Sequence, residues 1–97
     1  MDQALYYYKR AIDLDPQNSV ILYNIGILFN IRAEYCEAVK TLEMAINLDA
    51  ENVHAYLALG DAFERQGELA KAKQVFLSLQ NITSNIHGLS QKIQYLD

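Results

Sequence analysis

The 97-residue sequence predicts an all-α fold made of repeated pairs of antiparallel helices, and three observations support this prediction. Apolar positions recur at one fixed interval, as in the equally spaced Ala4, Ala38 and Ala72, and we call this spacing the repeat interval. Within each interval the apolar residues are three and four apart, which is the spacing of a helix packed on one face. Only one proline and four glycines occur, so few residues interrupt helices. A repeat interval as long as the spacing from Ala4 to Ala38 is typical of a stacked helix-turn-helix array.

The repeat interval relates large and small apolar residues alike. It joins Tyr8, Leu42 and Phe76 in the second helices of the predicted pairs. In the first helices it joins four pairs: Leu22/Tyr56, Ile25/Leu59, Gly26/Gly60 and Phe29/Phe63. Small residues where helices cross let two backbones approach closely, while the large residues interdigitate around them. The repeated pattern therefore predicts the packing as well as the helices.

The composition narrows the classes of protein to consider. The formal net charge is −4 and no basic run occurs, which argues against a nucleic-acid or anionic-membrane surface. No apolar run approaches the roughly 20 residues of a membrane span. The single cysteine, Cys36, has no internal disulfide partner, and a reducing compartment follows as the simplest expectation. We therefore predict a cytoplasmic protein.

The first two helices are predicted at residues 2–14 and 20 to about 32. Pro16 ends the first, because proline disfavours helical geometry in the residue before it and cannot donate a backbone hydrogen bond. Either Asn18 or Ser19 suits the N-cap of the second helix, since both side chains can accept from a backbone N–H. A return helix is predicted from residue 35 to about 48.

The boundary between the helix ending near residue 48 and the next helix has Ala50 at the position equivalent to Pro16. Without a proline, this boundary depends on Asn52 and on packing. Two further helices are predicted at residues 53–66 and 68 to about 80, with Gly67 between them, because glycine adopts positive φ at little cost. A last helix from Ile86 is expected to turn an apolar stripe to the stack and polar residues, Lys92 among them, outward.

In this order the residues resemble the tetratricopeptide repeat family. The resemblance covers a large residue, a Leu-Gly-type pair and an aromatic on each first helix, then small and large apolar residues on each second helix. It implies a right-handed α-α superhelix of antiparallel helix pairs, with about two and a half repeats and a C-terminal capping helix. Residues 1–97 then form one domain, divided into a half repeat (1–18), two full repeats (19–52 and 53–86) and the capping helix (87–97).

The half repeat implies that helix 2–14 lacks one neighbour. We expect part of its apolar surface to be open, including Leu5 and Tyr8. Arrays of this kind need about three units to bury a continuous core. One hypothesis is a homodimer in which a second copy covers this end, by packing of like ends or by helix exchange.

By resemblance, the first helices of successive repeats line a concave groove that takes an extended or helical segment of a partner protein. The predicted contacts are Val20, Tyr23, Asn24, Ile27, Ile31, His54, Leu57, Asp61 and Arg65. The resemblance gives Asn24 a hydrogen bond to the backbone of a bound peptide. Without a partner the apolar members would stay exposed to water, which is unfavourable because burial of an aliphatic side chain contributes about 1.5–3 kcal/mol. The leading prediction is a protein-interaction scaffold.

The sequence also bears on three other interpretations. The chain could be a structural or oligomerisation segment of a longer repeat protein that binds no ligand of its own. The carboxylate clamp of some co-chaperones in the family is disfavoured, because only Asn24 agrees with it and the expected cations fall on His54 and Ala58. An enzyme is not predicted, and neither is a cofactor or a metal, because His54 and His87 stand alone and no phosphate loop or nucleophile motif occurs.

Overall fold

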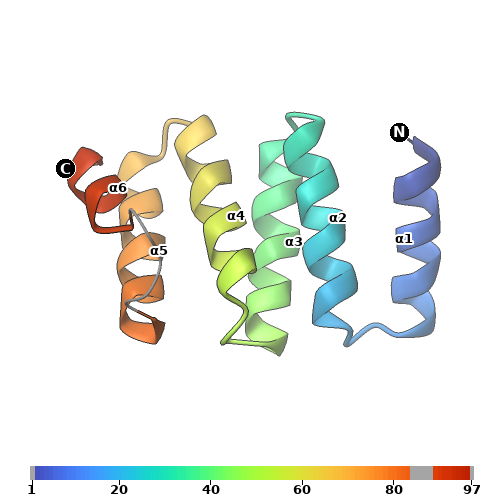
Figure 1. Cartoon of the computed structure of the whole chain (residues 1–97). Coiled ribbons are helices and arrows are strands. Elements are labelled where there is room, and N and C mark those ends of the chain that lie inside the picture. The colour runs from blue at the N-terminus through green and yellow to red at the C-terminus, as the bar shows by residue number, and fades with distance from the viewer. Residues whose placement is uncertain (1, 84–88, 97) are drawn as a thin grey trace.

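The computed structural model describes residues 2–83 and 89–96, and the described chain is all-α (Figure 1). Its helices are α1 (Asp2–Leu14), α2 (Ser19–Ile31), α3 (Tyr35–Leu48), α4 (Val53–Arg65), α5 (Leu69–Ile82) and α6 (Leu89–Tyr95). They form an elongated stack of 39 × 24 × 18 Å with α1 and α6 at its ends. The predicted fold class, a superhelix of antiparallel helix pairs, is confirmed. The predicted boundary between residues 86 and 87, and the start of the last helix at Ile86, lie outside the described residues.

The two complete pairs, α2–α3 and α4–α5, are closed by buried residues at equivalent positions. Ala38, Leu42 and Ala45 of α3 are fully buried, and so are Ala72, Phe76 and Leu79 of α5. Each set faces a glycine on the partner helix. A Cβ built on Gly26 would lie 2.6 Å from Leu42 Cγ, and one built on Gly60 would overlap the Phe76 ring. The pattern of small and large residues therefore sets how closely each pair packs.

The same side-chain cap begins both first helices. Asn18 Oδ1 accepts from Ile21 N at 3.1 Å, and Asn52 Oδ1 accepts from Ala55 N at 3.2 Å. Each bond satisfies a backbone donor that has no partner within its helix. Asn18 is thus the N-cap, and Ser19 is the first helical residue. The cap at Asn52 does not need a proline at position 50.

The turns inside the two repeats also have one geometry. Gly67 has φ 81°, as predicted for a glycine at a helix end, and Ala33, the equivalent residue one repeat earlier, has φ 61°. Alanine is strained in this left-handed region and glycine is not. The backbone of the turn is therefore imposed by the packing of the helix pair rather than by the residue that occupies it.

Helix α1 differs from the other second helices because, within the described chain, it contacts α2 alone. The prediction that Leu5 is open is wrong: Leu5 is 8% exposed and shares a core cluster with Ile25 and Phe29 of α2. Tyr8 is half-buried. The prediction failed for Leu5 because that side chain faces the following helix, which is present.

Helix α6 closes the other end of the stack. Ile93 and Leu96 are buried in the core cluster, as an apolar stripe requires. Lys92, predicted to point outward, keeps 41% of its side-chain surface exposed, but it also contacts the preceding pair. Its Nζ lies 2.8 Å from Glu64 Oε1 of α4 and 5.3 Å from the centre of the Phe76 ring. An ion pair and a cation–π contact thus tie α6 to both helices of the preceding pair.

Candidate functional site

The predicted site residues lie on α2 and α4, two first helices that contact one another directly. Most of them are equivalent pairs, separated by the repeat interval: Val20/His54, Tyr23/Leu57, Ile27/Asp61 and Ile31/Arg65. The spacing of three and four residues places each set along one side of its helix. The two helices therefore present one continuous surface with two different chemical characters.

A hollow of about 310 Å³ lies on this surface, and we call it the α2–α4 hollow. It is lined by Ile27, Asn30, Ile31, Tyr35, Ala58, Asp61 and Arg65. Four of the nine predicted residues therefore meet at one place. Ile31 is 65% exposed at its edge, whereas Ile27 is half-buried and packs against the core. The hollow combines an apolar side from α2 with a charged side from α4.

Asn30 fixes the spacing of the two helices beneath the hollow. Its Nδ2 donates to the backbone carbonyl of Ala58 at 3.2 Å, joining two helices that are distant in sequence. A side chain bonded to a neighbouring helix resists sliding of one helix along the other. Ala58 is small and buried, which leaves the space above it open.

The charged side of the hollow is a compact hydrogen-bonded group. Arg65 Nε donates to Asp61 Oδ2 at 3.1 Å, one helical turn away. The hydrogen bond from Arg65 to the Tyr35 oxygen, and then the Asp61 carboxylate, raise the pKa of Arg65 above its ordinary value. Arg65 therefore keeps its charge at every physiological pH, and its guanidinium is paired with the Asp61 carboxylate. Exposed pairs of this kind contribute little stability.

A second contact joins the two sets of predicted residues. The rings of Tyr23 and His54 are 6.3 Å apart and tilted by 49°. The remaining predicted residues, Val20, Asn24 and Leu57, do not line the hollow. Val20 is 60% exposed, and the Asn24 side chain, half-buried, has no hydrogen-bond partner among residues 2–83 and 89–96.

Tyr35 is the functional candidate that the sequence reasoning missed. It begins α3, a second helix, while the resemblance drew attention only to first helices. Its ring reaches the hollow because the turn after α2 is short, which brings the start of α3 beside the end of α2. The adjacent Cys36, also at the start of α3, is exposed and its Sγ accepts from Gln66 Nε2 at 3.3 Å.

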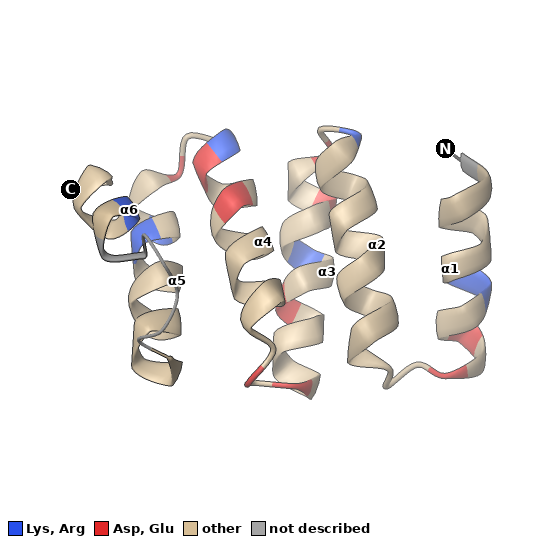
Figure 2. Cartoon of the chain, viewed as in Figure 1, with Lys and Arg blue, Asp and Glu red and all other residues tan. Residues whose placement is uncertain are grey.

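Charge divides the surface between the two helices (Figure 2). No lysine, arginine, aspartate or glutamate occurs between Ser19 and Ile31, so α2 is uncharged along its whole length. One end of α4 carries Asp61, Glu64 and Arg65. Glu64 is drawn toward Lys92 of α6, which leaves Asp61 and Arg65 as the charges beside the hollow.

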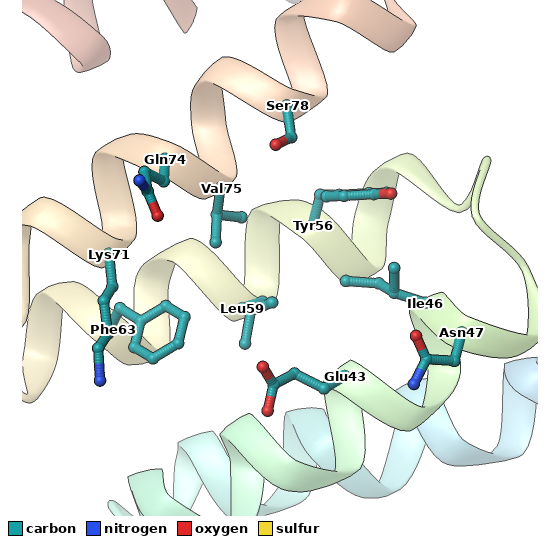
Figure 3. A pocket seen from close by; sticks show the side chains of 10 residues that line it. All are labelled: Glu43, Ile46, Asn47, Tyr56, Leu59, Phe63, Lys71, Gln74, Val75 and Ser78. Carbon is teal, nitrogen blue, oxygen red and sulfur yellow. The ribbon is translucent and has the colours of Figure 1, made fainter.

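A larger hollow of about 650 Å³ lies between α3 and α5 (Figure 3). Its lining comprises Glu43, Ile46, Asn47, Tyr56, Leu59, Phe63, Lys71, Gln74, Val75 and Ser78. None of the predicted residues is among them. Leu59 and Phe63 belong to the buried core, whereas Ile46, Tyr56 and Val75 are half-buried. This hollow is the packing gap between the second helices α3 and α5, and its floor is α4, which lies between them.

Two negative findings concern the described residues. Across 2–83 and 89–96, no three His, Cys, Asp or Glu side chains are grouped so that they could hold a metal ion. Over the same stretch, no helix has both the length and the apolar character needed to span a membrane.

Comparisons with known proteins identify the repeats. A sequence model described as "TPR repeat" matches residues 31–67, and one described as "Tetratricopeptide repeat" matches residues 53–85. The BBSome complex member BBS4 homolog of Drosophila melanogaster is 28% identical over 88% of this chain. Protein bimA of Emericella nidulans is 32% identical over 84% of it. The chain spans only 17% and 10% of the length of these two relatives.

Solved structures share the fold over almost the whole chain. The first TPR of Spaghetti (RPAP3), bound to the HSP90 peptide SRMEEVD, has a TM-score of 0.90 at 21% identity. The second TPR domain of human RPAP3, in complex with the HSP70 peptide SGPTIEEVD, has 0.88 at 25%. Both alignments cover 98% of this chain, and 75% and 79% of the other chain. These likenesses show the fold, and the matched repeats show that the chain belongs to the tetratricopeptide repeat family.

Proposed function

We propose that this chain is a protein-interaction scaffold whose α2–α4 surface binds a segment of a partner protein. The observation that carries the proposal is the α2–α4 hollow, where Ile27 and Ile31 meet Asp61 and Arg65. Similar repeat domains bind peptides in their solved complexes, which supports the class of function. The identity of the groove and of its contacts is our inference from the geometry.

The anchor of the partner is apolar in this proposal. Ile31 and Val20 expose 65% and 60% of their surface on the same helix, and α2 offers no charge. Covering such a side chain gains about 1.5–3 kcal/mol, which is enough to dominate a small interface. Asp61 and Arg65 then select the orientation of the bound segment. A positive group of the partner can pair with Asp61 in place of Arg65, and a negative group can pair with Arg65 in place of Asp61.

An acidic C-terminal peptide fits this surface poorly. The peptides bound by the two RPAP3 domains end in Glu-Glu-Val-Asp. Here Arg65 is already engaged by Asp61 and Tyr35, and Ala58 replaces a polar residue at the position equivalent to Asn24. With a net charge of −4, the chain also repels an acidic ligand. We therefore propose a partner segment with an apolar anchor.

A random-peptide display library selected on the immobilised chain tests the proposal. The selected peptides should be rich in apolar residues, and the measured quantity is their Kd for wild type and variants. Ile31→Asp should weaken binding by about tenfold or more. Met44→Asp on α3 is the matched control, because Met44 is 53% exposed and lies outside the hollow. Equal effects of the two variants, or tight binding of SRMEEVD alone, would contradict the proposal.

A second role, as a structural or oligomerising segment, is favoured by one specific observation. Helix α1 has only α2 as a neighbour in the described chain, and it leaves Tyr6, Tyr7 and Leu14 exposed. This role uses a different helix from the groove, so the two roles can be tested separately.

A further inference from the structure

The hollow between α3 and α5, which we call the α3–α5 hollow, is an open space in the middle of the stack. The first helices α2 and α4 contact one another directly, but in the described chain no Cα atom of α3 lies within 8 Å of one in α5. The two walls therefore stand apart, and α4 is exposed between them (Figure 3). Each wall is held on both sides, since α3 packs on α2 and α4, and α5 packs on α4 and α6. A volume of about 650 Å³ is within the range of ligand sites in proteins.

The floor of the α3–α5 hollow is a different side of α4 from the one that faces the α2–α4 hollow. The floor residues are Tyr56, Leu59 and Phe63. Those of α4 that line the α2–α4 hollow are Ala58, Asp61 and Arg65. At about 100° of rotation per residue, the two sets lie on nearly opposite sides of the helix. The two hollows are therefore separate surfaces that share one rigid helix.

The rim of the α3–α5 hollow offers hydrogen-bonding groups on both walls. Asn47 on α3, and Gln74 and Ser78 on α5, are exposed and have no hydrogen-bond partner in residues 2–83 and 89–96. Each of these side chains can both donate and accept. An extended segment brings backbone N–H and C=O groups that need such partners on burial, whereas a helix pairs its own. The rim therefore favours an extended ligand.

The length of the hollow fits a short extended segment. Lys71 and Ser78, at its two ends on α5, are two helical turns apart, which is about 10 Å at about 1.5 Å per residue. About three residues of an extended chain, at about 3.3 Å each, cover this length. Between the walls, the half-buried Ile46 and Val75 offer an aliphatic contact for one of their side chains.

The charge available in the α3–α5 hollow is negative. Lys71 Nζ lies 3.7 Å from Glu68 Oε2 and 5.9 Å from the centre of the Phe63 ring, so its charge is already engaged. Glu43, on the opposite wall, is exposed and has no ion-pair partner within the part of the chain that the structure describes. The net charge of −4 has the same sign. Complementarity therefore favours a basic group in the ligand.

We propose that the α3–α5 hollow binds an extended segment of a partner protein in which a lysine or arginine lies one or two residues from an aliphatic residue. The basic side chain pairs with Glu43, and the aliphatic side chain covers Ile46 and Val75. The rim amides of Asn47 and Gln74 bond the backbone of the segment. This site goes beyond the groove function, because the chain then holds two different segments on two sides of α4.

Peptides of about nine random residues, displayed and selected on the immobilised full chain carrying Ile31→Asp, supply the probes. This substitution disables the α2–α4 hollow, so the selected peptides report on other surfaces. We expect them to carry lysine or arginine one or two residues from an aliphatic residue, and to bind the wild-type chain with a Kd measured by fluorescence anisotropy. Selection of acidic or purely apolar peptides, or of none with a Kd below about 1 mM, would overturn the proposal.

Two charge reversals on α3 locate the binding. Glu43→Lys should weaken it at least about tenfold, because attraction becomes repulsion. Glu37→Lys is the matched control, since Glu37 is exposed on the same helix and lies outside the hollow, and it should change the Kd by less than about threefold. Circular dichroism should show both variants folded, because both positions are exposed. Equal losses in the two variants would overturn the proposal.

Two further measurements separate this site from the groove and from self-association. Peptides that bind the α2–α4 hollow of the wild-type chain should keep their Kd in Glu43→Lys, since Glu43 lies outside that hollow. Loss of both kinds of peptide in Glu43→Lys would contradict two separate sites. A dimer in sedimentation that Glu43→Lys dissociates would also overturn the proposal, because a second copy of the chain would then be the occupant.

Discussion

The two complete repeats agree where helices cross and differ where they face outward. In α2–α3 the crossing is built from Gly26, Leu42 and alanines, and in α4–α5 from Gly60, Phe76 and alanines. At the outward positions, Ile27 and Ile31 of α2 are replaced by Asp61 and Arg65 of α4 (Figure 2). Packing thus restricts the residues at the helix crossings and leaves the outward positions free to vary for recognition. The binding preference of the chain should therefore depend on the positions at which the repeats disagree.

The largest expected effects are at Phe76 and Leu42, and the equivalent Tyr8 provides the contrast. Phe76→Ala should destabilise the chain by about 3–5 kcal/mol and Leu42→Ala by about 2–5 kcal/mol, because each leaves a cavity beside a glycine. Tyr8→Ala should cost less than about 1 kcal/mol, because its side chain is only half-buried. Urea unfolding measures all three. A cost for Tyr8→Ala as large as that for Leu42→Ala would mean that something covers α1.

The next effect is at the two glycines of the crossings. Gly26→Ala and Gly60→Ala should each destabilise by about 1–3 kcal/mol, because the added Cβ meets a fully buried side chain. Helix propensity alone would favour alanine by about 1 kcal/mol, so the sign itself is diagnostic. Ser78→Ala at an exposed position of α5 is the control and should change stability by less than about 0.5 kcal/mol. Stabilisation by either glycine substitution would refute the close crossing.

The caps should give equal and smaller losses. Asn18→Ala and Asn52→Ala each remove one side-chain bond to a backbone N–H and should cost about 0.5–2 kcal/mol. Asn47→Ala, at an exposed position inside α3, should have almost no effect. Thermal melts compare the three variants directly. A much smaller loss at Asn52 would show that packing alone sets the boundary that lacks a proline.

The smallest effect is at the turn that the repeats share. Ala33→Gly removes the strain of a positive φ but raises the conformational entropy of the unfolded chain. We therefore expect the free energy of unfolding to rise by less than about 0.5 kcal/mol. Gly67→Ala introduces the same strain and should cost about 1 kcal/mol. The two melts should therefore shift in opposite directions. Shifts in the same direction would mean that the two turns do not share one backbone.

The sequence was sufficient for the fold because the repeat supplies each packing contact twice. The helix bounds 2–14, 35–48 and the start at 53 agree with α1, α3 and α4. Local signals, such as the caps and the positive φ of Gly67, depend on neighbouring residues and are readable from the chain. Contacts between helices distant in sequence are not. The pair of Lys92 with Glu64 and the burial of Leu5 both needed the packed stack.

The candidate site was predicted in part. Its four hollow residues were implied by the resemblance to the tetratricopeptide repeat family, and they stand at equivalent positions on neighbouring first helices. Tyr35 enters the hollow from the start of a second helix, a position that no periodicity marks. The bond from Asn30 to the Ala58 carbonyl likewise depends on the distance between α2 and α4.

The central claim is that α2 anchors the partner and that α4 refines its orientation. The most direct test is the Kd of display-selected peptides for Ile31→Arg and for Arg65→Ile, the two variants that exchange equivalent positions. Loss of the apolar contact in Ile31→Arg should weaken binding by about tenfold or more. Arg65→Ile should change the Kd by less than about threefold, because an exposed charge pair contributes little. A greater loss in Arg65→Ile than in Ile31→Arg would contradict the account.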